Sequence, residues 1–188
     1  MASGGVPSPD GVSVRPYRPA DHNACRRLWV ELAEHRGELY AQPTQAGRDG
    51  RDPRGDDPWV GFEEYLTRLD LSGLWVADTG PDGVVGFVGL TLDGSTGCID
   101  PVVVTRGRRG QGIGQALLAT VAAEARRRSL TQLTVSPSAR DHAALRSLLA
   151  AGFGSVSSVT LSYTLGTRRG HSAGPAEPLD LYDLRFRS

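Results

Sequence analysis

The sequence predicts one α/β (α+β) domain in which helices flank a sheet. Three observations indicate this: strand-like and helix-like segments alternate, a run of valines leads through a glycine turn into a helix, and 188 residues are enough for one domain with a core. The domain is expected to cover residues 12–187. Residues 1–11 are rich in Gly, Ser and Pro and lack the cationic start and apolar run of a signal peptide, so we expect a disordered leader there.

The first part of the domain predicts a strand, two helices and a long loop between them. Residues 12–15 alternate as a strand, and a helix is expected from Asp21 to a stop at Gly37. Residues 38–58 are rich in Gly, Pro, Asp and Arg without a period, which is typical of a loop, and residues 59–71 have helical spacing. The apolar face of the first helix consists of Cys25, Leu28, Trp29 and Leu32.

The second part predicts six strands and two helices. The turn at residues 80–83 joins the first two strands in a hairpin. The third strand, residues 98–105, is apolar enough to be buried on both faces. Helices are expected at residues 112–128 and from a cap at Asp141 to Gly152. The expected strands are residues 73–77, 84–92, 98–105, 130–135, 157–165 and 179–186.

The glycine turn between the valine run and the following helix is the strongest functional signal. Its sequence is Arg109-Gly-Gln-Gly-Ile-Gly114, and Arg106, Arg108 and Arg109 are expected to supply full positive charges to an anion. Glycines let backbone N–H groups converge on an anion, and the helix N-terminus adds partial positive charge. The turn therefore predicts a phosphate or pyrophosphate site.

Three interpretations of this turn remain open on the residues alone. It could be purely structural. A dinucleotide turn fits poorly, because the sixth position counted from Gly112 is Leu117 and Thr134 stands where an acidic ribose ligand is expected. A CoA pyrophosphate loop of the form R-x-x-G-x-G is matched by Arg109, Gly112 and Gly114. A phosphate loop with the G-K-[ST] ending is excluded, because all 21 basic residues are arginine.

This stretch resembles the acyl-CoA signature of the GNAT superfamily of N-acyltransferases, and the resemblance extends over residues 12–187. Residues 99–104 resemble the fourth strand of that family and residues 133–135 its fifth. Asp141, Ala144 and Gly152-Phe153 resemble its N-x-x-A…G-F helix. The resemblance implies a mixed, mostly antiparallel sheet whose central strands splay apart, with acetyl-CoA between them and no metal.

The resemblance also implies which residues would bind the cofactor. Pantetheine would pair with the backbone near Val102 and Val104, and the oxyanion donor would be an N–H of Val102 or Val103. Pro101 would then mark a bulge or the loss of a strand partner. The pyrophosphate would lie on the N–H groups of Arg109, Gly110, Gln111, Gly112, Ile113, Gly114 and Gln115.

The implied chemistry is direct attack of a primary amine, from a small molecule or a peptide, on the thioester in a ternary complex. Asp100 is the candidate base, against the alternative of a strand-end carboxylate bound by nearby N–H groups. The usual acid of the family, a tyrosine, is replaced by Leu148, so Ser147, Tyr163 or water would have to substitute. This departure keeps open a non-catalytic acyl-CoA sensor or partner module of the same fold.

Composition limits the other functions. Zero net charge and few aromatic residues argue against a nucleic-acid partner, and no run approaches the roughly 20 apolar residues of a membrane span. The histidines show no metal-ligand spacing. Cys25 and Cys98 are isolated, which suits a reducing, cytoplasmic setting. Loop 38–58 is expected either to help form the acceptor site or to be a solvated connector without substrate contact, and both alternatives stay open. A homodimer is kept as a candidate assembly.

Overall fold

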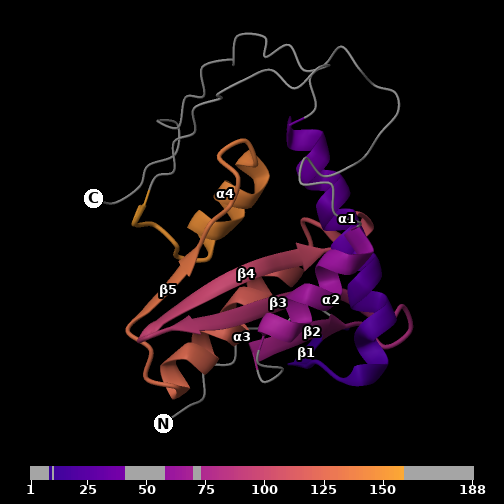
Figure 1. The fold of residues 1–188 in the computed structure, drawn as a ribbon, viewed down its shortest axis with the longest axis horizontal. Helices are drawn as coiled ribbons and strands as arrows, with labels where there is room; N and C mark the ends of the chain where they lie inside the picture. Colours follow the sequence, from indigo (N-terminus) through magenta and orange to yellow (C-terminus); the bar gives the residue numbers. More distant parts are fainter. Residues whose placement is uncertain (1–8, 10, 41–57, 70–72, 159–188) are drawn as a thin grey trace. The chain divides into compact units, whose positions relative to one another are not determined.

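The computed structural model describes residues 9, 11–40, 58–69 and 73–158. The chain forms two compact units, residues 1–136 and 137–188. The first unit holds a five-stranded sheet with helices on it (Figure 1). Its elements are β1 (Ser13–Pro16), η1 (Pro19–Asp21), α1 (His22–Tyr40), α2 (Pro58–Arg68), β2 (Leu74–Asp78), β3 (Val84–Asp93), β4 (Thr96–Val104), η3 (Arg106–Arg108), α3 (Ile113–Arg127) and β5 (Gln132–Val135). The described part of the second unit contains α4 (His142–Ala150).

The sheet is mixed and mostly antiparallel, as the resemblance implied. Its strands follow the order β1-β2-β3-β4-β5, and every neighbouring pair is antiparallel except β4 and β5, which are parallel. The parallel pairing covers only residues 96–99 of β4. The following residues of β4 have no β5 partner, so the two strands separate at that point.

Helices cover both faces of this sheet. Phe87 of β3 lies edge-on to Phe62 of α2, with ring centroids 6.1 Å apart. A Cβ atom at the adjacent Gly86 would meet Leu117 of α3 at 3.3 Å. Because neighbouring residues of a strand point to opposite faces, α2 and α3 lie on opposite sides of the sheet.

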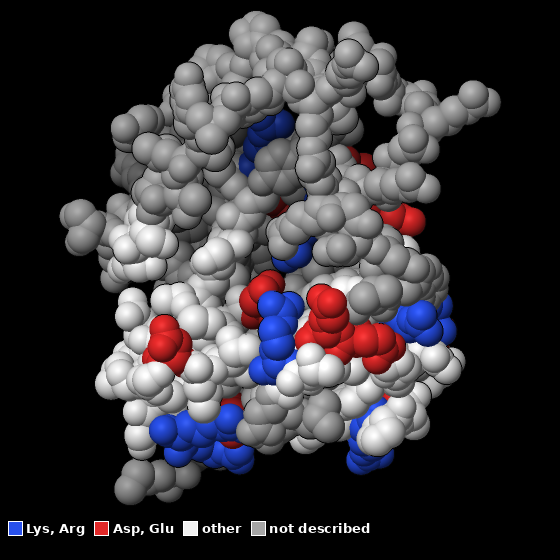
Figure 2. All heavy atoms as spheres, viewed as in Figure 1, with Lys and Arg blue, Asp and Glu red and all other residues white. Residues whose placement is uncertain are grey.

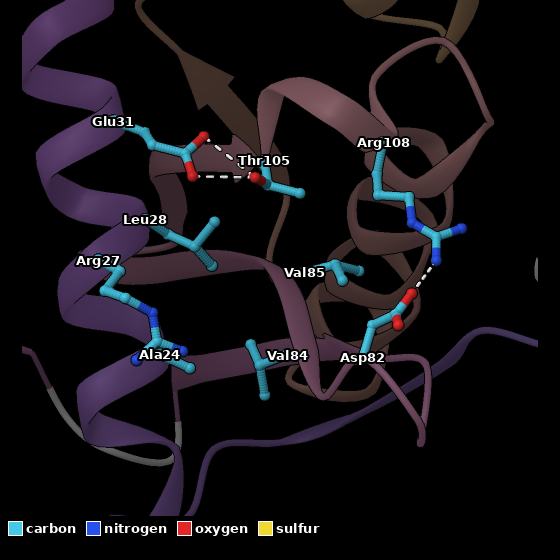
Figure 3. A pocket seen from close by; sticks show the side chains of 9 residues that line it. All are labelled: Ala24, Arg27, Leu28, Glu31, Asp82, Val84, Val85, Thr105 and Arg108. Carbon is cyan, nitrogen blue, oxygen red and sulfur yellow. Dashed lines mark hydrogen bonds and ion pairs between the residues drawn. The ribbon is translucent and has the colours of Figure 1, made fainter.

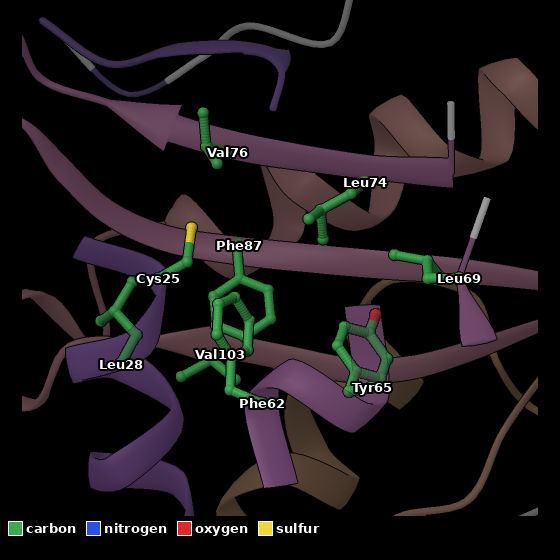
Figure 4. Close-up of a cluster of buried hydrophobic side chains, with 9 residues drawn as sticks. All are labelled: Cys25, Leu28, Phe62, Tyr65, Leu69, Leu74, Val76, Phe87 and Val103. Carbon is green, nitrogen blue, oxygen red and sulfur yellow. The ribbon is translucent and has the colours of Figure 1, made fainter. Parts of the chain in front are cut away.

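The main core cluster lies under α1 and α2 (Figure 4). Cys25 is fully buried in it, as its place on the apolar face of the first helix predicted, and burial raises the pKa of its thiol to about 12. The thiol therefore acts as a small apolar group. The cluster consists of Cys25, Leu28, Phe62, Tyr65, Leu69, Leu74, Val76, Phe87 and Val103.

Two sequence predictions about these elements are wrong. Gly37 does not stop the first helix, which continues to Tyr40. An interior glycine costs about 1 kcal/mol relative to alanine, and the last helical turn is held instead by Glu38, whose carboxylate accepts a 2.8 Å bond from Arg106. The third strand is not buried on both faces, because its burial alternates, with Val103 buried and Val102 and Val104 half-buried.

Other predictions differ at the edges or cannot be assessed. The second helix begins at Pro58, where a proline fits the first helical position, and ends at Arg68. Most of loop 38–58, almost all of the leader, and the expected strands at 157–165 (apart from its first two residues) and 179–186 lie outside the described residues.

An ion-pair network fastens the N-terminal edge of the sheet. The Arg15 guanidinium donates to both carboxylate oxygens of Asp21 at 2.8 Å and to Asp78 Oδ2 at 2.7 Å. Asp21 also accepts the Arg18 N–H at 2.8 Å and is 6% exposed. The bonds from Arg15 hold the pKa of Asp21 below its usual value. This network joins β1, η1 and β2.

We expect Asp21→Asn to lower the free energy of unfolding at neutral pH by about 2 kcal/mol, because Arg15 loses its two-point partner. A depressed folded pKa stabilises the fold above the unfolded value near 4 and stops doing so as pH falls through the lower folded value. Urea unfolding should therefore show the difference from wild type shrinking below about pH 4. Exposed Asp93→Asn is the control, within about 0.5 kcal/mol of wild type. A pH-independent loss would contradict the assignment.

Candidate functional site

The open edge of β4 is the first component of the site. The Thr105 N–H donates to Val85 O at 2.9 Å, which directs Thr105 toward β3. Alternate residues of an antiparallel strand point their backbone groups to opposite sides, so Val103 also faces β3. The backbone groups of Val102 and Val104 therefore point away from β3, toward the gap that β5 leaves. They are the groups that an extended ligand could pair with.

A bulge lies at the start of this open stretch. Val88 pairs with Val102 and Leu90 pairs with Ile99, so the single residue Gly89 lies opposite two residues of β4, Asp100 and Pro101. This confirms the expectation that Pro101 marks an irregularity. Because proline has no N–H, Val102 is the first residue after the bulge whose N–H points to the gap.

The glycine turn has the backbone geometry of an anion site. Gly110 and Gly112 have φ angles of 76° and 79°, in the left-handed region that favours glycine. Gly112 caps α3 without a side-chain hydrogen bond to the first turn. The first N–H groups of a helix lack intrahelical partners, so those of Ile113, Gly114 and Gln115 are left without a side-chain cap among the described residues.

The three arginines of the turn are placed differently from the expectation that all would supply charge to the anion. Arg106 pairs with Glu38 at 2.8 Å and lies 3.9 Å from Glu34, and Arg108 pairs with Asp82. Arg109 lies at the open edge, where its Nε donates to Val104 O at 3.0 Å. The positive charge of the turn is thus largely balanced by acids, and backbone N–H groups and Arg109 remain to attract a phosphate.

Glu31 of α1 anchors the beginning of this turn. Its carboxylate accepts the Thr105 hydroxyl at 2.9 and 3.1 Å and the Arg106 N–H at 3.0 Å. Sequence reasoning missed Glu31, because the partners are more than 70 residues apart and no local pattern links them. Figure 3 shows this contact at one end of a pocket of about 250 Å³, with Arg108 turned toward Asp82. The pocket lies between α1 and the turn, beside the candidate site.

Asp100 projects from the bulge on the face that α1 and α2 cover. Its Oδ1 lies 3.5 Å from Arg36 Nη2 of α1, and the two side chains are 71% and 53% exposed. Arg36 was not predicted as a site residue. The exposed, ion-paired carboxylate can attract a cationic ligand and can exchange protons with water, and it has no buried surroundings.

α4 belongs to the second unit. Asp141 caps it as predicted, since its carboxylate accepts the Ala144 N–H at 2.9 Å. Leu148, which stands where the family tyrosine is usual, is 8% exposed, and Ser147 is exposed. Tyr163 lies outside the described residues.

The described surface and interior hold few other functional signals. On the face in Figure 2 acidic and basic side chains are interspersed. Among the residues with assigned positions, no group of three or more His, Cys, Asp and Glu side chains is arranged to hold a metal ion. Within the same residues no helix is both long and apolar enough to cross a bilayer.

Known proteins share this fold. A structure of a GNAT-family acetyltransferase from Staphylococcus aureus Mu50 is 16% identical, with a TM-score of 0.57 over 76% of this chain and 83% of that chain. An aminoglycoside acetyltransferase from an uncultured soil metagenomic sample, in complex with sisomicin, is 16% identical, with a TM-score of 0.55 over 84% and 98%. N-acetylglutamate synthase from Neisseria gonorrhoeae, complexed with coenzyme A and N-acetyl-glutamate, is 21% identical, with a TM-score of 0.50 over 72% and 27%. No curated protein matches the chain.

The family follows from a sequence model. The model of the Acetyltransferase (GNAT) family matches residues 29–153, which include the bulge, the glycine turn and α4. The chain belongs to this family, and its fold, with β4 and β5 parting beside a helix N-terminus, agrees. It is an acyltransferase of the kind that takes its acyl group from a CoA thioester.

We expect Gly112→Val to reduce CoA affinity at least tenfold without unfolding the protein, because a β-branched residue is strained at φ 79° and the turn must change shape. Isothermal titration calorimetry with CoA measures the loss. Gly107→Val is the matched control from the same turn, since a Cβ atom at Gly107 meets nothing within 4 Å and its φ is not left-handed. Equal CoA affinity in both variants would remove the turn from the binding site.

Proposed function

We propose that the protein is an N-acetyltransferase that moves the acetyl group from acetyl-CoA to a primary amine of a small molecule or peptide. The observation that carries this proposal is the junction of three features in one region: the open edge of β4, the bulge at Asp100–Pro101 and the uncapped N-terminus of α3. In the proposal, residues 12–187 act as one domain in the cytoplasm.

The cofactor would lie along β4. The pyrophosphate would accept bonds from the N–H groups of the Arg109–Gln115 turn, while pantetheine would pair with the outward backbone groups of Val102 and Val104. Val103, between these two residues, would hold β4 in place, because its backbone groups face β3. The thioester would then reach the bulge, where the Val102 N–H would donate to the developing oxyanion.

Asp100 would act where the amine arrives. Its exposed carboxylate would attract the ammonium form and accept its proton through water, which frees the nitrogen lone pair. The nitrogen attacks the thioester carbonyl carbon, the C–N bond forms, and the C–S bond breaks. The departing CoA thiolate has an ordinary pKa near 8.5, so it can leave and take its proton from water without a dedicated side-chain acid.

The alternative, a non-catalytic acyl-CoA sensor, is favoured by Leu148. Turnover of acetyl-CoA across a library of primary amines, followed by thiol release, separates the two functions. Release above the hydrolysis background with at least one amine supports the enzyme. Binding of acetyl-CoA without acceleration by any amine would instead support the sensor, and absence of binding would reject both.

We expect Asp100→Asn to lower kcat/KM for the amine at neutral pH by about tenfold or more, with CoA affinity unchanged, because the variant loses the proton acceptor at the bulge. Steady-state kinetics at neutral pH test this, with Asp93→Asn as the control for loss of one exposed carboxylate. An unaltered rate would remove Asp100 from the mechanism.

A further inference from the structure

The Tyr65 side chain lies directly against the β4 bulge. Its oxygen is 1.6 Å from the position that a Cβ atom at Gly89 would occupy, and the main-chain oxygen of Asp100 is 2.8 Å from the same point. Gly89 is the β3 residue opposite the bulge. The phenol therefore fills the space that any other residue at 89 would need for its side chain.

This contact explains a glycine in the middle of a ten-residue strand. A glycine inside a strand loses backbone entropy and offers nothing to pack, so it usually marks a bulge or a close approach by another group. Here both conditions hold, since Tyr65 approaches from α2 and the bulge lies opposite. The sequence thus makes room for the Tyr65 ring and its hydroxyl at one defined position.

The Tyr65 hydroxyl has no hydrogen-bond partner among the described residues. Tyr65 lies at one side of the core cluster, near Leu69 and Leu74 (Figure 4). The residue is 5% exposed, its ring lies 4.9 Å from that of Trp29, and its hydroxyl is buried. Leaving a buried hydroxyl unbonded costs free energy, and phenylalanine would fill nearly the same space without that cost. Phe62 and Phe87 in the same cluster show that the core accepts phenylalanine. A hydrogen bond that forms when a ligand lies on β4 would account for the hydroxyl.

The Tyr65 hydroxyl is suited to donate a hydrogen bond. Burial, with the nearby Asp100 charge, raises the pKa of the phenol, so it stays protonated and is ill suited to deliver its proton to a thiolate. A protonated hydroxyl can donate a hydrogen bond, and the main-chain carbonyl of Asp100 is an acceptor close to it. The Asp100–Val104 stretch lacks β5 on its outer edge, so a ligand that pairs with it can shift this backbone by a small amount.

We propose that Tyr65 is a positioning residue of the acyl site: its hydroxyl donates to the main-chain carbonyl of Asp100 once acyl-CoA lies along β4, and so fixes the bulge that directs the Val102 N–H to the thioester. This inference rests on the proposed function. Tyr65 touches neither the acyl group nor the amine. It acts through the backbone of Asp100, and it does so from the face that α1 and α2 cover.

Tyr65→Phe tests the proposal, with Tyr17→Phe as the matched control. Tyr17 is a half-buried tyrosine whose hydroxyl lies 3.4 Å from His22 Nδ1, away from the bulge. Thermal unfolding without ligand should show Tyr65→Phe as stable as wild type or more so, since an unbonded hydroxyl is removed. Its kcat should fall about tenfold, the effect of one hydrogen bond, with the KM for the amine within twofold of wild type.

A second readout distinguishes this role from simple packing. The rise in unfolding temperature that saturating acetyl-CoA produces should be smaller in Tyr65→Phe than in wild type and Tyr17→Phe, because only the first variant lacks the bond formed with ligand. Equal kcat and equal acetyl-CoA stabilisation would overturn the role of Tyr65 and leave the enzyme intact. A ligand-free Tyr65→Phe less stable than wild type would also overturn it, since the hydroxyl would already be bonded. If wild type binds no acetyl-CoA, the proposed function fails and this role with it.

Discussion

Beyond Ile99, β4 is hydrogen-bonded to β3 on one edge and has no β5 partner on the other. Backbone groups in the middle of a sheet are normally all paired, because an unpaired buried N–H or C=O is costly. The outward groups of Val102 face the side that β5 leaves open, and the outward carbonyl of Val104 accepts a bond from Arg109 Nε. The Asp100–Pro101 bulge begins the open stretch, and the glycine turn ends it. The position of every candidate ligand contact depends on this one-sided pairing.

α1 braces the same region from one side. Glu31 holds the backbone at Thr105 and Arg106, Glu38 pairs with the Arg106 side chain, and Arg36 reaches Asp100. These contacts link one helix to both ends of the open stretch. The last turns of α1 stay helical past Gly37 where these partners lie. A change in the position of this helix would move the start of the anion turn and the carboxylate at the bulge together.

Much of the site could be predicted because its signals are local. The glycine turn is recognisable from Arg109, Gly112 and Gly114 alone, since left-handed φ angles and an uncapped helix N-terminus are properties of a few consecutive residues. Pro101 in a valine strand likewise indicated an irregularity. The pairing of Arg106 and Arg108 with Glu38 and Asp82 could not be predicted, because charge alone does not say which acid a folded chain brings near. The same holds for Glu31, Arg36 and Tyr65.

The sequence by itself determined the class of the protein, the order of the described strands and helices, and the left-handed glycine turn before α3, because periodicity, glycine conformation and helix capping act over short distances along the chain. Only the tertiary structure decided which arginines remain to face an anion and which β4 backbone groups point away from β3. It also decided that the buried Tyr65 hydroxyl of α2 lies against the bulge, in the space that a side chain at Gly89 would occupy. These depend on segments up to 75 residues apart, such as Glu31 and Arg106, and on strand register, which one residue of bulge shifts.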